Sequence, residues 1–309
     1  MSVTAVAPAK INLSLRVGAR RRDGFHQLHT LFHAVDLKER VTVSDAEGPE
    51  DTVEVTGTDA PHVPVGRANL ALVAARELRL AAGLGEAERP VLIQIDKGIP
   101  VAGGLAGGSA DAAAALVALN QLWGLGLNSA ELSTVAAQVG SDVPFLLLGG
   151  SAIGTGRGEV LQPVPAGGQF HWVLLTSRAG LSTPTVFRRF DYMALSGNLP
   201  QRHAGAGLGE PPAIPEALIA GLEAGDPVAV GANLVNDLQP AAIDLRPGLG
   251  QMAVRAVMAG AAGAVVSGSG PTVALLARSA AHAKGMAEEL VDAADGVVCT
   301  AGPAPGVIG

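Results

Sequence analysis

The segment from Pro100 to Ala110 constrains this chain most, because it places four glycines within six positions and then continues as an alanine-rich stretch with helical spacing. Glycine lets a backbone adopt positive φ and approach an anion closely, and the free N–H groups of a helix's first turn favour negative charge. The junction therefore predicts a phosphate-binding site, with a nucleoside triphosphate as its natural occupant. The alternative is a glycine-rich turn that only begins a tightly packed helix.

Two common phosphate loops are excluded by the sequence. A Walker loop ends in Gly-Lys-Ser or Gly-Lys-Thr, and the chain contains no Gly-Lys pair. The dinucleotide-binding pattern Gly-x-Gly-x-x-Gly does not occur either. The segment therefore belongs to a third kind of phosphate loop.

The composition is that of a globular chain with well-buried cores, since 48% of the 309 residues are hydrophobic. A net charge of −7 argues against nucleic acid and anionic membrane surfaces as partners, while a local basic pocket for a small phosphorylated ligand stays compatible with it. The single cysteine, Cys299, permits neither an internal disulfide nor a cysteine metal cluster. The first ten residues lack the pattern of an export signal, so we expect a cytoplasmic protein without a membrane anchor.

Hydrophobic periodicity predicts the elements of the first half. Alternating apolar and polar positions favour strands within residues 3–17 and 34–57. Apolar residues at helical spacing predict one helix over residues 69–82 and another from the glycine loop to Trp123.

A further helix is predicted before a short apolar run. Asn128 and Glu131 form a capping-box pattern for a helix that ends near Gly140. The run Val143–Leu148 is interpreted as a buried strand, which would place Asp142 at a helix-to-strand corner.

The second half mixes irregular and regular segments. Residues 196–213 lack apolar periodicity and predict a mobile surface loop whose truncation should be tolerated. The regular segments are two helices, 230–238 and 250–260, and two paired strands, 264–267 and 272–277, around the glycine turn 268–271. Strands and helices alternate without a strict βαβ period, so the predicted class is α+β, with a domain boundary around 155–175.

Two charged residues are candidates for catalysis. Lys10 lies in an apolar strand, and Asn12, two positions on, points to the same face. Lys10 could be a snorkelling lysine at a strand edge, and Asp142 could cap a turn. Together they supply what phosphoryl transfer needs: a carboxylate that orients or deprotonates a hydroxyl, and a cation beside the developing charge.

Five motifs together resemble those of one kinase family. They are Ala-Pro-Ala-Lys10-Ile-Asn12-Leu, Asp23-Gly24-Phe25-His26, Pro100 to Ala110, Ser141-Asp142-Val143-Pro144 and Ser267-Gly-Ser-Gly-Pro271-Thr. Nearly end to end, the chain resembles the 4-diphosphocytidyl-2-C-methyl-D-erythritol kinases of the GHMP kinase superfamily. The resemblance implies a two-domain α+β fold with the active site in the interdomain cleft. It implies an N-terminal ATP-binding domain over residues 1–160 and a C-terminal domain over residues 161–309.

The resemblance also implies an activity, the ATP-dependent phosphorylation of the 2-hydroxyl of 4-diphosphocytidyl-2-C-methyl-D-erythritol in the non-mevalonate pathway of isoprenoid precursor biosynthesis. Lys10 and Asp142 become the catalytic pair. Mg²⁺ accompanies ATP and needs few protein ligands, of which Ser109 is a candidate. The ATP-binding residues that the resemblance implies are Asn69, Lys97, Pro100, Val101, Ala102, Gly103, Gly104, Leu105, Ala106, Gly107, Gly108, Ser109 and Ala110.

The substrate side is implied in the same way. A cytosine needs a stacking platform and hydrogen-bond partners, which Phe25, His26 and Phe187 can supply. Asn12 and Thr183 match positions that hold the methylerythritol and phosphate portions. The family usually has tyrosine in place of Phe25, so stacking is kept and a hydroxyl contact is lost. The plainer alternatives are a core role for Phe187 and a surface turn for His26.

Some positions depart from the family pattern or have only a supporting role. Ala102 and Ala106 stand where glycine is common, and Ala110 where serine is common, so the added methyl groups restrict φ. The turn Gly268–Pro271 resembles the superfamily's third motif, with a simple hairpin turn as the alternative. Asn236–Asp237 is interpreted as a helix cap or a supporting pair, because the sequence offers no charge partner for it.

Two other functions compete with this interpretation. A kinase of the same superfamily that acts on homoserine, mevalonate or a sugar would share the phosphate loop, but the aromatic pair and His26 would have no task. A non-catalytic nucleotide-binding regulator would keep the glycine loop and lose the catalytic pair, which is present here. The sequence does not determine an oligomeric state.

Overall fold

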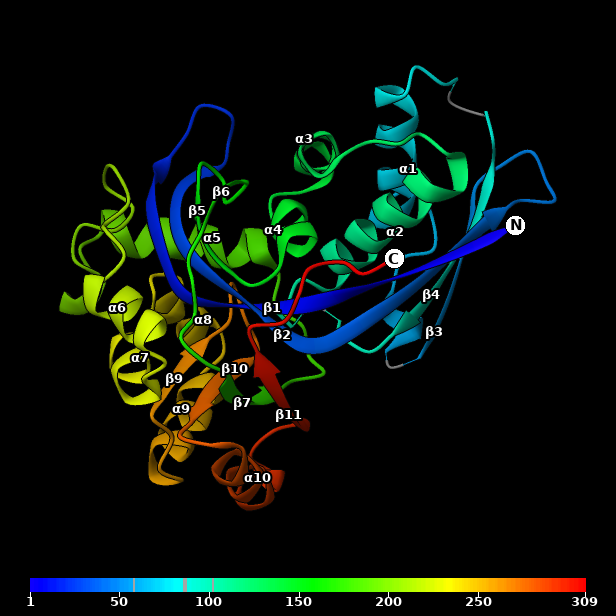
Figure 1. The fold of residues 1–309 in the computed structure, drawn as a ribbon. Coiled ribbons are helices and arrows are strands. Elements are labelled where there is room, and N and C mark those ends of the chain that lie inside the picture. Colours follow the sequence, from blue (N-terminus) through cyan, green and yellow to red (C-terminus); the bar gives the residue numbers. More distant parts are fainter. Residues whose placement is uncertain (58, 86–87, 102) are drawn as a thin grey trace.

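The computed structural model describes residues 1–57, 59–85, 88–101 and 103–309, so Ala102 of the predicted phosphate loop lies outside the described residues. A long antiparallel hairpin of β1 (Ser2–Arg20) and β2 (His26–Asp45) runs across the molecule, with α1 to α4 on one side and a smaller sheet on the other (Figure 1). The predicted α+β class is confirmed.

The hairpin is the centre of a seven-stranded sheet among the described residues, in the order β3-β4-β2-β1-β8, with β5 paired to β2 and β6 to β5. Its other strands are β3 (Thr52–Gly57), β4 (Val91–Lys97), β5 (Ser151–Thr155), β6 (Val160–Pro163) and β8 (Val235–Asn236). The second sheet has the order β11-β7-β10-β9, and its strands are β7 (Phe170–Thr176), β9 (Gly263–Val266), β10 (Val273–Ala277) and β11 (Gly296–Gly302).

Helices cover both sheets. The α-helices are α1 (Leu70–Ala81), α2 (Gly107–Trp123), α3 (Ser129–Val139), α4 (Val143–Leu148), α5 (Thr183–Leu195), α6 (Glu216–Ala224), α7 (Pro227–Asn233), α8 (Gln239–Leu245), α9 (Gly248–Met258) and α10 (Ala280–Glu289). Short 3₁₀ turns are η1 (Ala60–His62), η2 (Gln201–His203) and η3 (Val291–Ala293). The predicted capping box is confirmed, because Asn128 and Glu131 bond each other's backbone N–H groups. No helix in the described parts of the chain is long and apolar enough to cross a membrane.

Strand β1 contributes to two separate hydrophobic cores. Its buried apolar side chains up to Leu13 pack in a core with α1 to α4 and one face of the smaller sheet, whereas Leu15 and Val17 pack with the other face of that sheet and α5. The ladder with β2 shifts register between Asn12 and Ser14, where β1 passes from one core to the other. The cores therefore do not divide at residue 160, and the domain limits 1–160 and 161–309 stay a prediction.

The predicted strand over Val143–Leu148 is wrong, because these residues form helix α4. An apolar run of this length is compatible with either a strand or a buried helix, and periodicity does not separate the two. Pro144 near the helix start and Gly149 just after its end are compatible with a helix but do not exclude a strand. Asp142 therefore lies at a corner between two helices.

Two expectations for the second half are also corrected. The predicted helix 230–238 ends at Asn233 as α7, and the chain then forms β8, which pairs in parallel with β1. Residues 196–213 pack against β1, since Gly207 N–H bonds the carbonyl of Val17 and the His203 side chain is buried. This packing contradicts the mobile loop, and truncation would remove a buried side chain from the second core's edge.

Candidate active site

A cavity of about 890 Å³ lies where the hairpin crosses from one core to the other. Its walls come from the β1–β2 hairpin, the glycine loop before α2, the α3–α4 corner, the start of α5 and the turn at Gly268. The volume falls in the range of small-molecule sites. The predicted site residues that line it are Lys10, Asn12, Phe25, His26, Gly103, Gly104, Ala106, Gly107, Gly108, Ser109, Asp142, Thr183 and Phe187.

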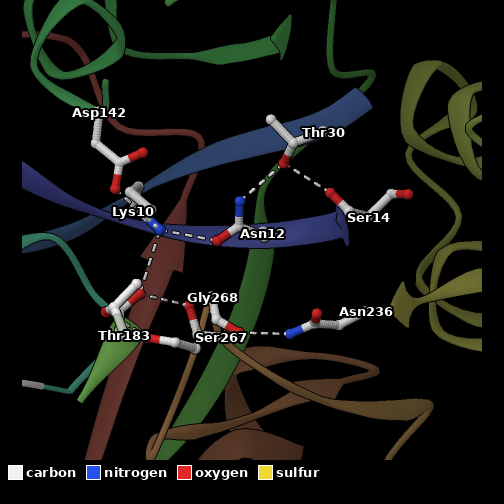
Figure 2. Close-up of polar contacts among 11 residues, drawn as sticks. Lys10, Asn12, Ser14, Thr30, Asp142, Thr183, Asn236, Ser267 and Gly268 are labelled. Carbon is white, nitrogen blue, oxygen red and sulfur yellow. Dashed lines mark hydrogen bonds and ion pairs between the residues drawn. The ribbon is translucent and has the colours of Figure 1, made fainter. Parts of the chain in front are cut away.

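Lys10 places its ammonium group at the centre of the polar contacts in this cavity (Figure 2). Its Nζ donates to Oδ1 of Asn12 at 2.8 Å and to the carbonyl of Gly104 at 3.3 Å, and lies 3.4 Å from Oδ2 of Asp142. The lysine is only 4% exposed, so it is not a snorkelling residue at a strand edge. The structure therefore brings Lys10 and Asp142 together in the cavity.

Asp142 stands at the N-cap position of α4 but does not use its carboxylate to cap the helix. The carboxylate instead faces Lys10, and about a third of the side chain is exposed. The capping alternative therefore does not apply. A partly exposed carboxylate beside a buried ammonium is available to a ligand in the cavity.

The glycine loop needs its glycines for a close approach between two turns. Gly104 has φ of 77°, and a Cβ on it would lie 2.1 Å from the carbonyl oxygen of Ser267 in the Gly268 turn. The Oγ of Ser267 donates to the carbonyl of Gly104, which joins the two turns directly. Ala106, where the family commonly has glycine, also has a positive φ, of 62°, which costs an alanine about 1 kcal/mol. The loop is thus joined to a turn in the far half of the chain.

Some predicted ATP-binding residues do not line the cavity: Asn69, Lys97, Pro100, Val101, Leu105 and Ala110. Asn69 is 4% exposed and caps α1, because its side chain accepts from Ala71 N–H and donates to the carbonyl of Pro64. Leu105 and Ala110 are buried in the core beneath the loop. Leu105 and Ala110 therefore anchor the loop in the core rather than face a ligand.

Lys97 forms a buried charge cluster behind the glycine loop. Its Nζ lies 2.5 Å from Oε1 of Glu39 and 2.9 Å from Oδ2 of Asp111, and all three residues are almost fully buried. A Cβ on Gly107, the first residue of α2, would lie 3.2 Å from Glu39 and 3.3 Å from Lys97. Asp111 is the lone acid in the alanine-rich helix α2, and this sequence signal was missed. Glu39 stands among other charged residues of β2 and had no such signal.

The cluster has two carboxylates for one ammonium, so one proton balances its charge. Burial, with the nearby Asp111 carboxylate, raises the pKa of Glu39 to about 7 despite the opposing effect of Lys97. Burial also raises the pKa of Asp111. Oδ1 of Asp111 has no hydrogen-bond partner within the described residues, as expected for a group whose charge is poorly compensated.

We expect Glu39→Gln to change how the free energy of unfolding depends on pH. Since the folded-state pKa of Glu39 is raised from its ordinary value near 4.5, the folded state keeps a proton that the unfolded state releases. The contribution of Glu39 to the free energy of unfolding is therefore fully present below pH 4.5 and is lost as the pH rises through about 7. Urea unfolding at pH 5 and pH 8 should therefore show the variant gaining about 2–3 kcal/mol relative to the parent at the higher pH.

The matched control for this change is Glu50→Gln, at an exposed carboxylate. Its free energy of unfolding should follow that of the parent at both pH values. Parallel pH dependences for Glu39→Gln and the parent would show that Glu39 holds no extra proton in the fold.

The aromatic residues form a second end of the cavity. The rings of His26 and Phe187 stack with centroids 4.8 Å apart, and Nε2 of His26 bonds Oδ1 of Asp191 at 2.8 Å. Phe25 is half exposed, and the guanidinium of Arg157 lies 4.9 Å from its ring centroid. The surface turn does not describe His26, which is buried and lines the cavity. Phe187 packs against the second core and also lines the cavity, so its core role and its place in the site are both present.

Positive side chains outnumber negative ones around the cavity. Lys10, Arg20, Arg157 and Arg188 line it, against the carboxylates of Asp142 and Asp191. An acidic protein thus has a local basic pocket, which favours an occupant with several negative charges. The three arginines were missed from the sequence because they come from three different segments with no motif of their own.

The pair Asn236–Asp237 supports the site from behind. Nδ2 of Asn236 donates to the carbonyl of Val266 at 2.7 Å. It also donates to the carbonyl of Gly268 at 2.7 Å and so holds the glycine turn beside Lys10 (Figure 2). Asp237 is fully buried and pairs with Arg16 and His203. The structure therefore provides the charge partners that the sequence did not reveal. Both observations agree with a supporting pair.

Comparisons with known proteins identify the family. The family models "GHMP kinases N terminal domain" and "GHMP kinases C terminal" match residues 69–150 and 218–295. A 4-diphosphocytidyl-2-C-methyl-D-erythritol kinase of Nocardia farcinica is 50% identical over 97% of this chain and 94% of its own length. A 4-diphosphocytidyl-2-C-methyl-D-erythritol kinase of Kineococcus radiotolerans is 51% identical over 94% of this chain and 86% of its own length. The chain belongs to this family of GHMP kinases.

Solved structures of GHMP kinases share the fold of this chain. A crystal structure of 4-(cytidine 5'-diphospho)-2C-methyl-D-erythritol kinase has a TM-score of 0.73 at 33% identity and covers 98% of this chain and 100% of its own. A crystal structure of L. major mevalonate kinase in complex with R-mevalonate also has a TM-score of 0.73 and covers 97% of this chain and 95% of its own. Its sequence identity is 13%, so this likeness shows the fold alone. The chain is accordingly a small-molecule kinase, and kinases of this family use ATP as the phosphate donor.

Proposed function

We propose that this kinase transfers the terminal phosphoryl group of ATP to the 2-hydroxyl of 4-diphosphocytidyl-2-C-methyl-D-erythritol, in the non-mevalonate pathway of isoprenoid precursor biosynthesis. The observation that carries the proposal is the 3.4 Å approach of Lys10 and Asp142 between the glycine loop and the His26–Phe187 stack. A phosphate-binding end, a reacting centre and an aromatic end thus lie in one cavity. The names of the most similar relatives support the same substrate.

In the proposed reaction, the acceptor hydroxyl lies against Asp142 and ATP's terminal phosphate lies against the glycine loop. The carboxylate accepts a hydrogen bond from the hydroxyl and either orients it or takes its proton. The hydroxyl oxygen bonds to the terminal phosphorus as the bond to the β-phosphate oxygen breaks, and ADP leaves. Lys10, already 3.4 Å from Asp142, stabilises the negative charge that develops on the transferred group.

The chain offers oxygen donors for the magnesium that accompanies ATP. The described residues contain no group of three or more His, Cys, Asp or Glu side chains that could hold a metal ion. Magnesium keeps several waters and binds through phosphate oxygens and one or two protein groups, so such a group is not required. The hydroxyl of Ser109, in the first turn of α2 and on the cavity wall, fits a direct or water-mediated ligand. The ion would neutralise charge on the phosphates.

The cytosine would occupy the aromatic end of the cavity. Phe25 and Phe187 offer ring faces for stacking, and His26 is held in one orientation by Asp191. Thr183 bonds Ser269 of the glycine turn and with Asn12 lies near the reacting centre, where the methylerythritol and phosphate portions would bind. Homoserine and mevalonate have no ring to stack, so this end of the cavity favours the cytidine compound over those rivals.

The deciding experiment is an ADP-release assay on the purified kinase with four acceptors: 4-diphosphocytidyl-2-C-methyl-D-erythritol, mevalonate, homoserine and galactose. We expect release above the background ATPase rate with the cytidine compound alone. Release with mevalonate, homoserine or galactose and none with the cytidine compound would overturn the proposed substrate. Tight ATP binding without release for any acceptor would favour the regulator.

A further inference from the structure

Three buried polar side chains stand in a row behind the proposed reacting centre. Lys10 and Asn12 on β1 and Thr30 on β2 are 4%, 2% and 0% exposed. Nζ of Lys10 donates to Oδ1 of Asn12 at 2.8 Å, and Nδ2 of Asn12 donates to Oγ1 of Thr30 at 2.8 Å. Oγ1 of Thr30 in turn donates to the backbone carbonyl of Ser14 at 2.7 Å (Figure 2). The row ends in the backbone at the register shift of the hairpin.

The direction of each hydrogen bond in this row is fixed from both ends. A backbone carbonyl only accepts, so the one hydroxyl proton of Thr30 is committed to Ser14 and its oxygen is left to accept from Asn12. An ammonium only donates, so the carbonyl side of the Asn12 amide must face Lys10. A flipped amide would point its N–H groups at the ammonium. Thr30 therefore selects the amide orientation that Lys10 requires.

Lys10 depends on that orientation, because its ammonium has three N–H donors and three acceptors from different parts of the fold. These are Asn12 on β1, the Gly104 carbonyl in the glycine loop and the Asp142 carboxylate at the α3–α4 corner. The bond to Asn12 is the shortest of the three and comes from the lysine's own strand. Without it, the ammonium would shift towards the loop or the carboxylate.

We propose that Thr30 is a positioning residue for phosphoryl transfer, acting through Asn12 to hold the Lys10 ammonium between the glycine loop and Asp142. The inference rests on the proposed function, which assigns charge stabilisation to Lys10. Thr30 lines the cavity, but its hydroxyl is used by Ser14 and Asn12, so we assign it no hydrogen bond to phosphate or acceptor. The methyl group of Thr30 fills space in the hairpin, whereas its hydroxyl orients the Asn12 amide. The two groups can therefore be tested separately.

The test compares Thr30→Val, which removes the hydroxyl, with Thr30→Ser, which keeps it. Each kcat and each KM for ATP is measured well below the melting temperature of the variant. We expect kcat of Thr30→Val to fall roughly 10- to 100-fold, because a small misplacement of a reacting group has an effect of this size, while KM for ATP stays within about threefold. Thr30→Ser should keep kcat within about threefold of the parent. Thr42→Val, on the same strand with its hydroxyl bonded to Thr4 at the surface, is the matched control and should leave kcat unchanged.

A second readout needs no acceptor and therefore separates this inference from the proposed substrate. In ¹⁵N NMR spectra of the ATP-free kinase, the side-chain amide protons of Asn12 should exchange slowly in the parent and in Thr30→Ser, and faster in Thr30→Val. If the parent prefers another acceptor, the kcat comparison is made with that acceptor, and only the proposed substrate fails. Equal kcat for Thr30→Val and Thr30→Ser, or Asn12 exchange unaffected by the valine, would overturn the positioning role.

Discussion

Lys10→Met is expected to lower kcat by about 10³-fold or more while the kinase stays folded and still binds ATP. The expected size follows from the cationic groups of phosphoryl-transfer enzymes, whose removal costs 10³–10⁵ in rate, because the charge on the transferred group is stabilised mainly by positioned cations. Methionine keeps the length of the lysine stem in a pocket whose walls include Phe32, 5.7 Å from Nζ at its ring centroid. The loss should therefore lie in kcat more than in KM for ATP, measured by steady-state ADP release.

The control for this prediction is Lys38→Met, the same substitution at an exposed lysine that pairs with Asp36. It should leave kcat within about twofold of the parent. Asp142→Asn provides an independent arm, since removing an orienting or basic carboxylate costs about 10²–10⁴ in rate. Turnover by Lys10→Met at the parent rate would contradict the proposed mechanism, even if the substrate were correct.

Lys97→Met is expected to destabilise the fold by about 3–5 kcal/mol, the usual cost of leaving buried charges without their partner. The substitution leaves the carboxylates of Glu39 and Asp111 buried with no ammonium within the cluster. Both must then take up protons or remain uncompensated. Urea unfolding at pH 8 should show the loss, and it should shrink at pH 5, where protonation removes part of the unpaired charge.

Two variants make this prediction specific. Lys284→Met removes a lysine that is exposed on α10 and should change the free energy of unfolding by less than about 0.5 kcal/mol. The double variant Glu39→Gln/Lys97→Met carries one ionisable carboxyl group fewer and should recover part of the loss. If the free energy of unfolding of Lys97→Met lies within about 1 kcal/mol of the parent's, then Lys97 is not the counter-charge of the cluster.

Much of the site could be predicted from local sequence, because its main parts are short motifs with strong backbone requirements. The glycines before α2 predict a close approach of the backbone. The structure confirms it at Gly104, where an added Cβ would lie 2.1 Å from the carbonyl oxygen of Ser267. Lys10 and Asn12, two apart in a strand, had to share a face, and both line the cavity. The capping box of α3 is equally local and was predicted to the residue.

Other features had no local signal. The run Val143–Leu148 is apolar at every position and reads equally well as strand or helix, so its packing against the neighbouring helices decided between them. The segment 196–213 is polar and rich in glycine, yet His203 is drawn inward by the buried Asp237, more than thirty positions away. Lys97 was expected among the ATP-binding residues, but its ammonium pairs with Glu39 and Asp111.

What the sequence determined by itself was therefore the chemistry available to the chain: a glycine loop for phosphate, a lysine and an aspartate suited to phosphoryl transfer, and aromatic residues suited to a base. Only the tertiary structure decided which of these meet, which carboxylates are paired, and which hydroxyl orients Asn12. The physical reason is that backbone conformation is set within a few residues, whereas burial and charge pairing depend on groups brought together over distances such as the 132 positions between Lys10 and Asp142.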